Sequence, residues 1–132
     1  MARIDYSDSA KYNDRTRELL GKNRNANIFR MMAHSPSYLS QYCRLGGAIR
    51  NRGELDPVVR ELAITRTGIL CEAPYEIVKL KRPTDATFNA IGAKLTPGAL
   101  VELQLSVGFY IMTSKFLETF EIDMQPVTEV IG

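Results

Sequence analysis

The sequence predicts an all-α fold, and three observations lead to that prediction. Apolar residues recur at spacings of three and four along most of the chain, which is the period of a helix with one buried face. Prolines next to short polar residues separate these segments, as they do where helices begin or end. The chain contains no internal repeat and no low-complexity tract. We therefore expect a succession of connected helices.

Residues 1–24 are predicted to form an extended N-terminal arm. They are polar, with Leu19 and Leu20 as a local apolar pair. A terminal segment of this kind is ordered only where it is tied down, and we expect it to pack on a partner subunit. Residues 25–132 then form a single all-helical domain.

Two helices are expected at the start of that domain. The first lies in "NANIFRMMAHSP" and stops before Pro36, because the residue before a proline disfavours helical backbone. The second lies in "SYLSQYCRLGGAIR", with Ser35 or Ser37 as its N-terminal cap. Its apolar spacing places Cys43 at mid-helix on the buried face.

The next helix has the clearest start signal in the chain. In "ELDPVVRELAITRTGILC", Asp56 can accept hydrogen bonds from the first free backbone N–H groups, and Pro57 suits the first helical position. The apolar residues that follow keep a helical spacing. We expect this helix to end near Cys71.

Two further helices are expected after Pro83. The first, in "TDATFNAIGAKL", is short and is capped by Thr84 or Asp85. The second, in "TPGALVELQLSVGFYIMTSKFLETF", is long and apolar around almost its whole circumference, so we expect it to be buried on most sides. Its β-branched residues would also suit a strand, but its length favours a helix. A chain of this size has few other elements to cover such a helix, which predicts a homo-oligomer.

Composition restricts the class of protein. The 132 residues are 45% hydrophobic and 24% charged, which fits one globular domain. The net charge of +2 comes from interleaved acidic and basic residues, so a nucleic-acid partner is not expected. The N-terminus lacks the apolar core of a secretory signal, and no apolar run is long enough to span a membrane. We expect a cytoplasmic protein whose two cysteines are reduced thiols.

Three stretches between Asn27 and Asp123 stand out together. They are "NIFRMMAHSPSYLSQY", "LDPVVRELAITRTGILCEAPYE" and "PTDATFNAIGAKLTPGALVELQLSVGFYIMTSKFLETFEID". In this order they resemble the carboxymuconolactone decarboxylase-like family of the alkyl hydroperoxidase-D-like superfamily. The resemblance implies an all-helical bundle that assembles as a trimer or hexamer. It also implies a Cys/His/Glu site in the peroxidase branch, or acid-base residues in the decarboxylase branch.

Four residues are the site candidates that this resemblance implies: Glu61, Cys71, Tyr75 and Glu76. Each also has an ordinary structural explanation. A thiol at the end of an apolar helix is commonly packed and unreactive, and a helix glutamate beside arginines is commonly paired or solvated. A tyrosine such as Tyr75 can be half-buried with its hydroxyl in water.

The sequence departs from the family at the positions that carry its chemistry. The peroxidase branch has a second cysteine three residues after the first, and Pro74 stands there. The decarboxylase branch has a histidine four residues after the glutamate, and Leu80 stands there. No histidine follows His34. The family has roughly 40 to 50 further residues here, enough for two helices and their loops. The join near Tyr75 or Glu76 indicates a missing segment, either a natural deletion or a part of a longer chain that this sequence omits.

Two other polar residues need an explanation. His34 precedes Ser35 and Pro36 and is expected at a helix end, and one histidine makes no metal-ligand set. Glu102 lies on the long apolar helix, where an unpaired buried carboxylate is costly. We expect it to pair with an arginine or to face a polar cavity.

Three functions are consistent with the sequence. The first is a carboxymuconolactone decarboxylase-like enzyme that acts on a small lactone or acidic aromatic-pathway metabolite, with no cofactor and no metal. The second is a thiol-dependent alkyl hydroperoxidase-like protein. The third is a non-catalytic helical oligomer that binds a small molecule. Fold resemblance does not choose among them.

Overall fold

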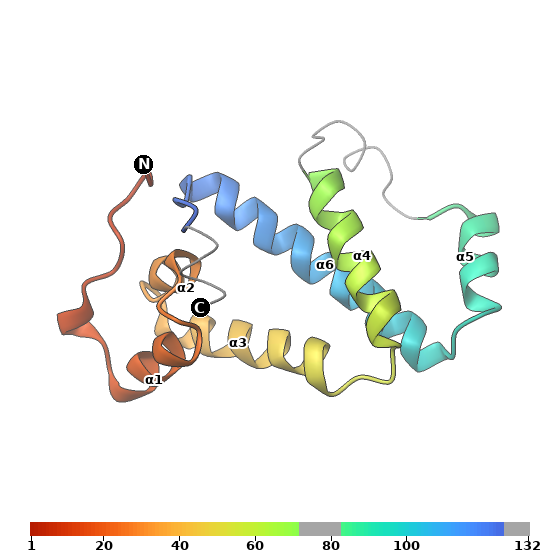
Figure 1. Cartoon of the computed structure of the whole chain (residues 1–132), viewed down its shortest axis with the longest axis horizontal. Coiled ribbons are helices and arrows are strands. Elements are labelled where there is room, and N and C mark those ends of the chain that lie inside the picture. The colour runs from red at the N-terminus through yellow and green to blue at the C-terminus, as the bar shows by residue number, and fades with distance from the viewer. Residues whose placement is uncertain (72–82, 126–132) are drawn as a thin grey trace. The chain divides into compact units, whose positions relative to one another are not determined.

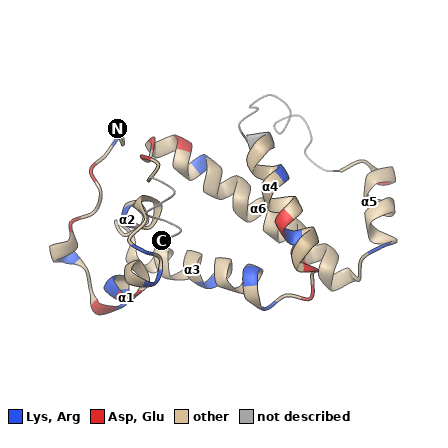
Figure 2. Ribbon diagram, viewed as in Figure 1, with Lys and Arg blue, Asp and Glu red and all other residues tan. Residues whose placement is uncertain are grey.

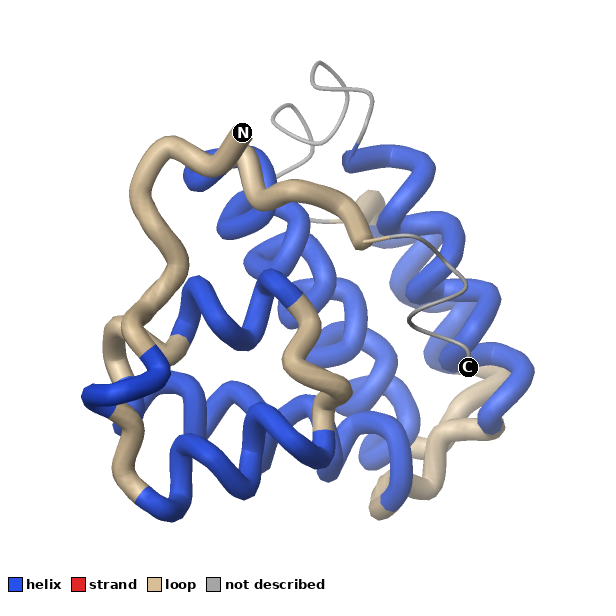
Figure 3. The backbone as a smooth tube through the Cα atoms, turned by 60° about the vertical axis from the view of Figure 1, so that its left-hand side comes forward, coloured by secondary structure: helices blue, strands red, loops and turns tan. Residues whose placement is uncertain are grey.

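The computed structural model describes residues 1–71 and 83–125, and these are helical or irregular, with no strand among them (Figure 3). The all-α prediction is confirmed for this part of the chain. Within it, no helix is both long enough and apolar enough to cross a membrane.

A short 3-10 helix, Ser9–Lys11, precedes six α-helices in the described residues (Figure 1). The helices are α1 (Asp14–Lys22), α2 (Asn27–Met32), α3 (Pro36–Asn51), α4 (Pro57–Cys71), α5 (Asp85–Gly92) and α6 (Pro97–Phe120). The five helices predicted after residue 24 are therefore present. Of the alternative caps for α5, it is the Thr84 hydroxyl that accepts from Thr87 N–H, at 3.2 Å.

The chain divides into two compact units. The terminal unit comprises Met1–Gly46 and the chain from Phe116 onward, and the central unit comprises Gly47–Lys115. This division differs from the predicted arm followed by one domain. The boundary falls inside α3, at the Gly46-Gly47 pair, and inside α6.

The prediction of an extended arm is wrong for residues 14–22, which form α1. Asn13 caps this helix, its side-chain oxygen accepting from the backbone N–H of Thr16 at 2.7 Å. Thr16, Leu19 and Leu20 are buried. Their spacing of three and four residues forms a short helical stripe, of which the two leucines alone are apolar.

The first residues of the chain contact its own C-terminal part. Arg3 N–H donates to the carbonyl of Phe120 at 2.9 Å, and the Arg3 side chain pairs with Glu121 at 2.7 Å. The Tyr6 hydroxyl donates to Asp123 at 2.9 Å. The terminal unit is thus closed by contacts between the two ends of the chain.

The core of the terminal unit is a cluster of four buried residues. These residues are Leu19, Leu20, Ala33 and Leu39. The partly buried side chains of Tyr12, Phe29, Met32 and Cys43 pack against them. The prediction that Cys43 lies on the apolar face of its helix is confirmed.

The central unit contains α4, α5 and most of α6, and α6 is much less buried within the chain than the sequence predicts. Its buried residues are Ala99, Ser106 and Phe109, all on one side of the helix. Val101, Leu105 and Met112 are at least half exposed. The expectation that α6 is buried on most sides is therefore wrong for a single chain, in which one side of this helix is buried.

Candidate functional site

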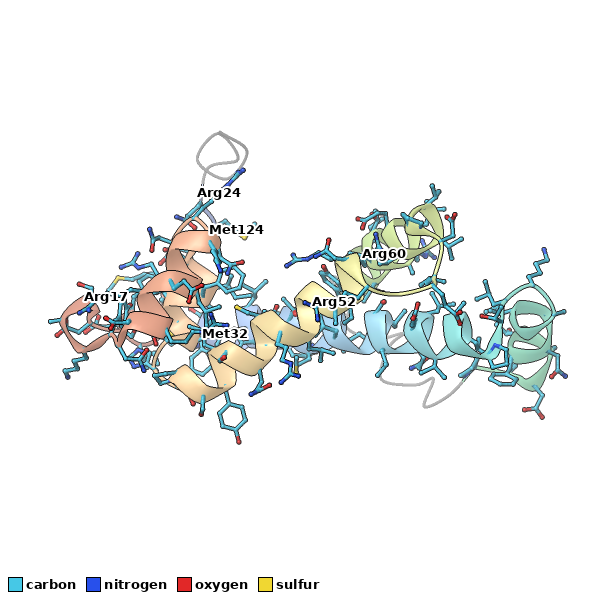
Figure 4. All side chains as sticks on the ribbon, turned by 90° about the horizontal axis from the view of Figure 1, so that it is seen from below. Arg17, Arg24, Met32, Arg52, Arg60 and Met124 are labelled. Atoms are coloured by element: carbon cyan, nitrogen blue, oxygen red, sulfur yellow. The ribbon has the colours of Figure 1, made fainter. Side chains whose placement is uncertain are left out.

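The first turns of α4 carry the candidate site, and Asp56 fixes where they begin. Its carboxylate accepts from the backbone N–H groups of Val58 and Val59, at 2.8 and 3.1 Å. This is the cap predicted from the sequence, and it satisfies two of the free donors at the start of the helix. Arg60 follows in the first turn of α4 (Figure 4), and Glu61 is the next residue of the helix.

Arg60 is a largely buried cation with few acceptors. Its side chain is only 12% exposed. One guanidinium nitrogen, Nη1, donates to the carbonyl of Ile49 at 3.5 Å, which is a long hydrogen bond. Its Nε is buried and makes no hydrogen bond with any residue that the structure describes. A buried charge needs good partners, and the hydrogen bonds of this guanidinium are incomplete among the described residues.

Glu61 is the nearest acid to that guanidinium. Its Oε1 lies 3.5 Å from Nε of Arg60, close enough for an ion pair but without hydrogen-bond geometry. The Glu61 side chain is 64% exposed. Its carboxylate is therefore both accessible and adjacent to a buried positive charge.

The helix does not bring Glu61 and Cys71 together. Both belong to α4, ten residues apart. At 1.5 Å per residue, their positions lie about 15 Å apart along the helix axis. A glutamate side chain cannot cover that distance, so within one chain Glu61 does not act directly on the end of α4 where Cys71 stands.

The other site predictions lie outside the described residues. These are Tyr75, Glu76 and the proposed join near them, and the side chain of Cys71. Of the four predicted site residues, Glu61 is the one whose surroundings the structure describes.

Two glutamates hold the loop before α4 against the start of α6. Glu102 of α6 accepts from the backbone N–H groups of Glu54 and Leu55, at 3.1 and 2.7 Å. In return, Glu54 accepts from the Thr96 hydroxyl at 2.7 Å, and that hydroxyl also accepts from Ala99 N–H in the first turn of α6. We call this set of contacts the carboxylate clasp.

The clasp needs glycine at two positions. A Cβ atom on Gly53 would lie 2.5 Å from Oε2 of Glu102, and one on Gly98 would overlap Oε1 of Glu54. The two carboxylates lie so close to the backbone at positions 53 and 98 that any residue other than glycine would clash with them. We expected Glu102 to pair with an arginine or to face a polar cavity. That expectation is wrong, because its carboxylate accepts hydrogen bonds from backbone N–H groups.

The acidic residues near the start of α4 fall into two groups, those whose carboxylates accept structural hydrogen bonds and those whose carboxylates do not. Glu54, Asp56 and Glu102 each accept hydrogen bonds that fix the α3–α4 loop or a helix start. Glu61 has no such role. Arg60 is not among the site residues predicted from the sequence, although it directly precedes the candidate Glu61.

The remaining candidates lie in the terminal unit and have structural partners. His34 is exposed, and its Nε2 lies 2.8 Å from the carbonyl of Asp5. Cys43 is half-buried and accepts a contact from Asn23 at 3.7 Å. No group of three or more metal-ligating side chains occurs in the described ranges.

Two residues of the terminal unit, Tyr6 and Asp123, have shifted pKa values. Hydrogen bonding from Tyr6, and then the N-terminal ammonium 3.1 Å away, hold the pKa of Asp123 below its usual value. Burial, and then the hydrogen bond to Asp123, raise the pKa of Tyr6. These shifts belong to the closure of the terminal unit and not to the candidate site on α4.

Comparison with known proteins gives no relative for this chain. No family model, no curated protein and no solved structure matches it.

Proposed function

We propose that the protein is a carboxymuconolactone decarboxylase-like enzyme that acts on a small lactone or acidic aromatic-pathway metabolite without a cofactor. The resemblance of the three sequence motifs supports the family. The observation that supports an acidic substrate is the Arg60 guanidinium, 12% exposed and with a buried Nε that has no hydrogen-bond partner in the described part of the chain. A carboxylate is the ligand that best satisfies such a group.

In this proposal Arg60 binds a carboxylate of the substrate and Glu61 transfers a proton. Loss of CO₂ leaves an electron pair on the neighbouring carbon, which must gain a proton from an acid within hydrogen-bond reach. A carboxyl group next to the bound substrate can supply it. Cys71, Tyr75 and Glu76 remain proposed site residues on the strength of the resemblance.

The test compares two site variants with one matched control. Glu61→Gln should lower kcat by about 100-fold or more, the usual contribution of a general acid or base. Arg60→Lys should raise KM, because an ammonium cannot bind a carboxylate in the bidentate manner of a guanidinium. Arg66→Gln changes an exposed arginine later on the same helix and should leave both constants unchanged.

The readout is the decay of lactone absorbance or the release of CO₂, with melting temperatures measured for every variant. If Glu61→Gln turns over the substrate as fast as the wild type does, the proposed role of Glu61 is wrong. Consumption of hydroperoxide with a thiol reductant, lost in Cys71→Ser, would instead support the alkyl hydroperoxidase-like function.

A second candidate function is a non-catalytic binding protein. The distance of about 15 Å along α4 between Glu61 and Cys71 favours it, because a scaffold can keep its anion-binding arginine after its catalytic residues have separated. An acidic lactone that raises the melting temperature of the wild type but not of Arg60→Lys, without turnover, would support this function.

We also propose that the protein is cytoplasmic and works as a homo-oligomer, a trimer or hexamer as the resemblance implies. The exposed apolar side chains of the central unit support assembly, since monomers rarely leave large apolar patches in water.

A further inference from the structure

One exposed face of α6 is apolar along about three turns. Val101 is 59% exposed, Leu105 is 52% exposed and Met112 is 50% exposed, and the exposed Gly108 lies between the last two. Spacings of four, three and four residues place all four positions on one side of a helix. We call these four residues the α6 stripe.

The α6 stripe is rotated by about 120° around the helix from the centre of its buried face, and it carries no charge. Ala99, Ser106 and Phe109 occupy the buried side. From Leu103 to Ser114 the helix has no charged residue, and Figure 2 shows this middle part without blue or red. An exposed helix face is normally polar, whereas a helix that is apolar all round is normally buried.

We propose that the α6 stripe binds the α6 stripe of a second copy of this chain, with the two helices antiparallel across a twofold axis. The axis passes between Ser106 and Val107. It places Val101 opposite the copy's Met112, and Leu105 opposite the copy's Gly108. The same surface then serves both partners, as a twofold interface requires.

The side chains of the stripe are complementary in this arrangement. A Cβ atom on Gly108 would meet nothing within 4 Å, so there is open space above this glycine. The antiparallel pairing fills it with the copy's Leu105. A parallel pairing would set leucine against leucine and glycine against glycine, which leaves a clash and a gap.

α4 carries a stripe with the same spacing but poorer complementarity. Val58, Leu62 and Ile69 are all more than half exposed, and Thr65 takes the position that corresponds to Gly108. The β-branched threonine leaves no space for a facing leucine. The α4 stripe is therefore the matched control for the α6 stripe.

This inference rests on the proposed assembly and not on the proposed activity. A monomeric wild type would reject both the assembly and the α6 contact. An oligomer whose size does not depend on the α6 stripe would reject only the contact.

The first experiment measures mass by light scattering for the wild type, Leu105→Glu, Gly108→Leu and the control Leu62→Glu. We expect Leu105→Glu to weaken association by about 100-fold or more, because each interface would bury two unpaired carboxylates. Gly108→Leu should weaken it too by filling the space for the copy's leucine, and Leu62→Glu should leave it unchanged. Loss of association in Leu62→Glu, or its retention in Leu105→Glu, would overturn the proposal.

The second experiment fixes the register by disulfide formation. Val101→Cys and Met112→Cys are oxidised separately and as a mixture, and the wild type supplies the background from its own cysteines. The antiparallel pairing predicts a cross-linked dimer in the mixture and none above background in either variant alone. Cross-linking of each variant with itself would show a parallel pair and overturn the assignment.

Discussion

The terminal and central units differ in how many of their apolar side chains they bury. Among the described residues, the terminal unit buries six apolar side chains and the central unit buries three. The central unit exposes eight large apolar side chains, six of them in the α4 and α6 stripes. The exposed ones of the terminal unit are fewer, and two of them, Met1 and Met124, lie at or near its chain ends.

Different kinds of contact also stabilise the interior of each unit. The terminal unit has an apolar cluster around Leu20 and Leu39. The central unit relies on polar contacts of the α3–α4 loop, namely the carboxylate clasp and the Asp56 cap. The terminal unit thus forms its apolar core within the chain, whereas the central unit leaves much of its apolar surface exposed.

The largest expected effect contrasts one leucine from each unit. Leu39 is fully buried, so Leu39→Ala should lower the free energy of unfolding by about 3 kcal/mol through lost burial and a cavity. Leu62 is 65% exposed, so Leu62→Ala should change it by less than about 0.5 kcal/mol. Urea unfolding followed by circular dichroism measures both. Similar losses for the two variants would remove the contrast.

The next effect tests whether the clasp supports the central unit. Glu102→Ala leaves the backbone N–H groups of Glu54 and Leu55 without their acceptor, at a cost of about 2 kcal/mol. Gln104→Ala, at an exposed position of the same helix, should be nearly neutral. Amide hydrogen exchange should show faster exchange at residues 54 and 55 in the first variant only. Unchanged protection there would show that the clasp does not hold the loop.

Glycine substitutions give a smaller effect whose sign depends on the position. Gly47 in α3 has open space where a Cβ would stand, so Gly47→Ala should stabilise its helix by about 0.5 to 1 kcal/mol. Gly98→Ala, in the first turn of α6, should destabilise instead, because its Cβ would displace Glu54. Thermal unfolding of the two variants should shift in opposite directions. A stabilised Gly98→Ala would mean that Glu54 moves aside without cost.

The smallest effect concerns the closure of the terminal unit. The pKa of Asp123 is lowered, first by the hydrogen bond from Tyr6, so its stabilising contribution is present above the ordinary aspartate pKa and disappears as the pH falls through the lowered value. Tyr6→Phe removes that donor and should raise the pKa of Asp123 towards its ordinary value. NMR titration of the Asp123 carboxyl carbon measures this change. An unchanged pKa would assign the shift to the N-terminal ammonium.

Local signals in the sequence predicted most of the helices. Asp56 with Pro57 gave the start of α4, and Thr96 with Pro97 gave the start of α6, because caps and prolines act within one helical turn. Helix α1 was missed because its stripe of Thr16, Leu19 and Leu20 is too short to stand out by period alone. The exposure of α6 was missed because apolar period does not tell which faces the same chain covers.

The site was less predictable than the fold. Glu61 could be named from the sequence, but its distance from Cys71 depends on α4 continuing without a break, and its neighbour Arg60 matters only through burial. The partners of Glu102 are backbone groups of a loop 47 and 48 residues away in the chain. A sequence pattern records residue types and spacings, and contacts of that kind depend on tertiary structure.

The mass of the wild-type chain as a function of concentration tests the central claim most directly, namely that the exposed stripe of the central unit is completed by a second copy. A single pair of helices is a small interface, so association should be visible between about 1 μM and about 1 mM. Light scattering should then show a mass that rises from 14.8 kDa to an even multiple of it, a dimer or a hexamer. A mass that stays at 14.8 kDa throughout, or one that settles at three copies, would contradict the twofold pairing of α6.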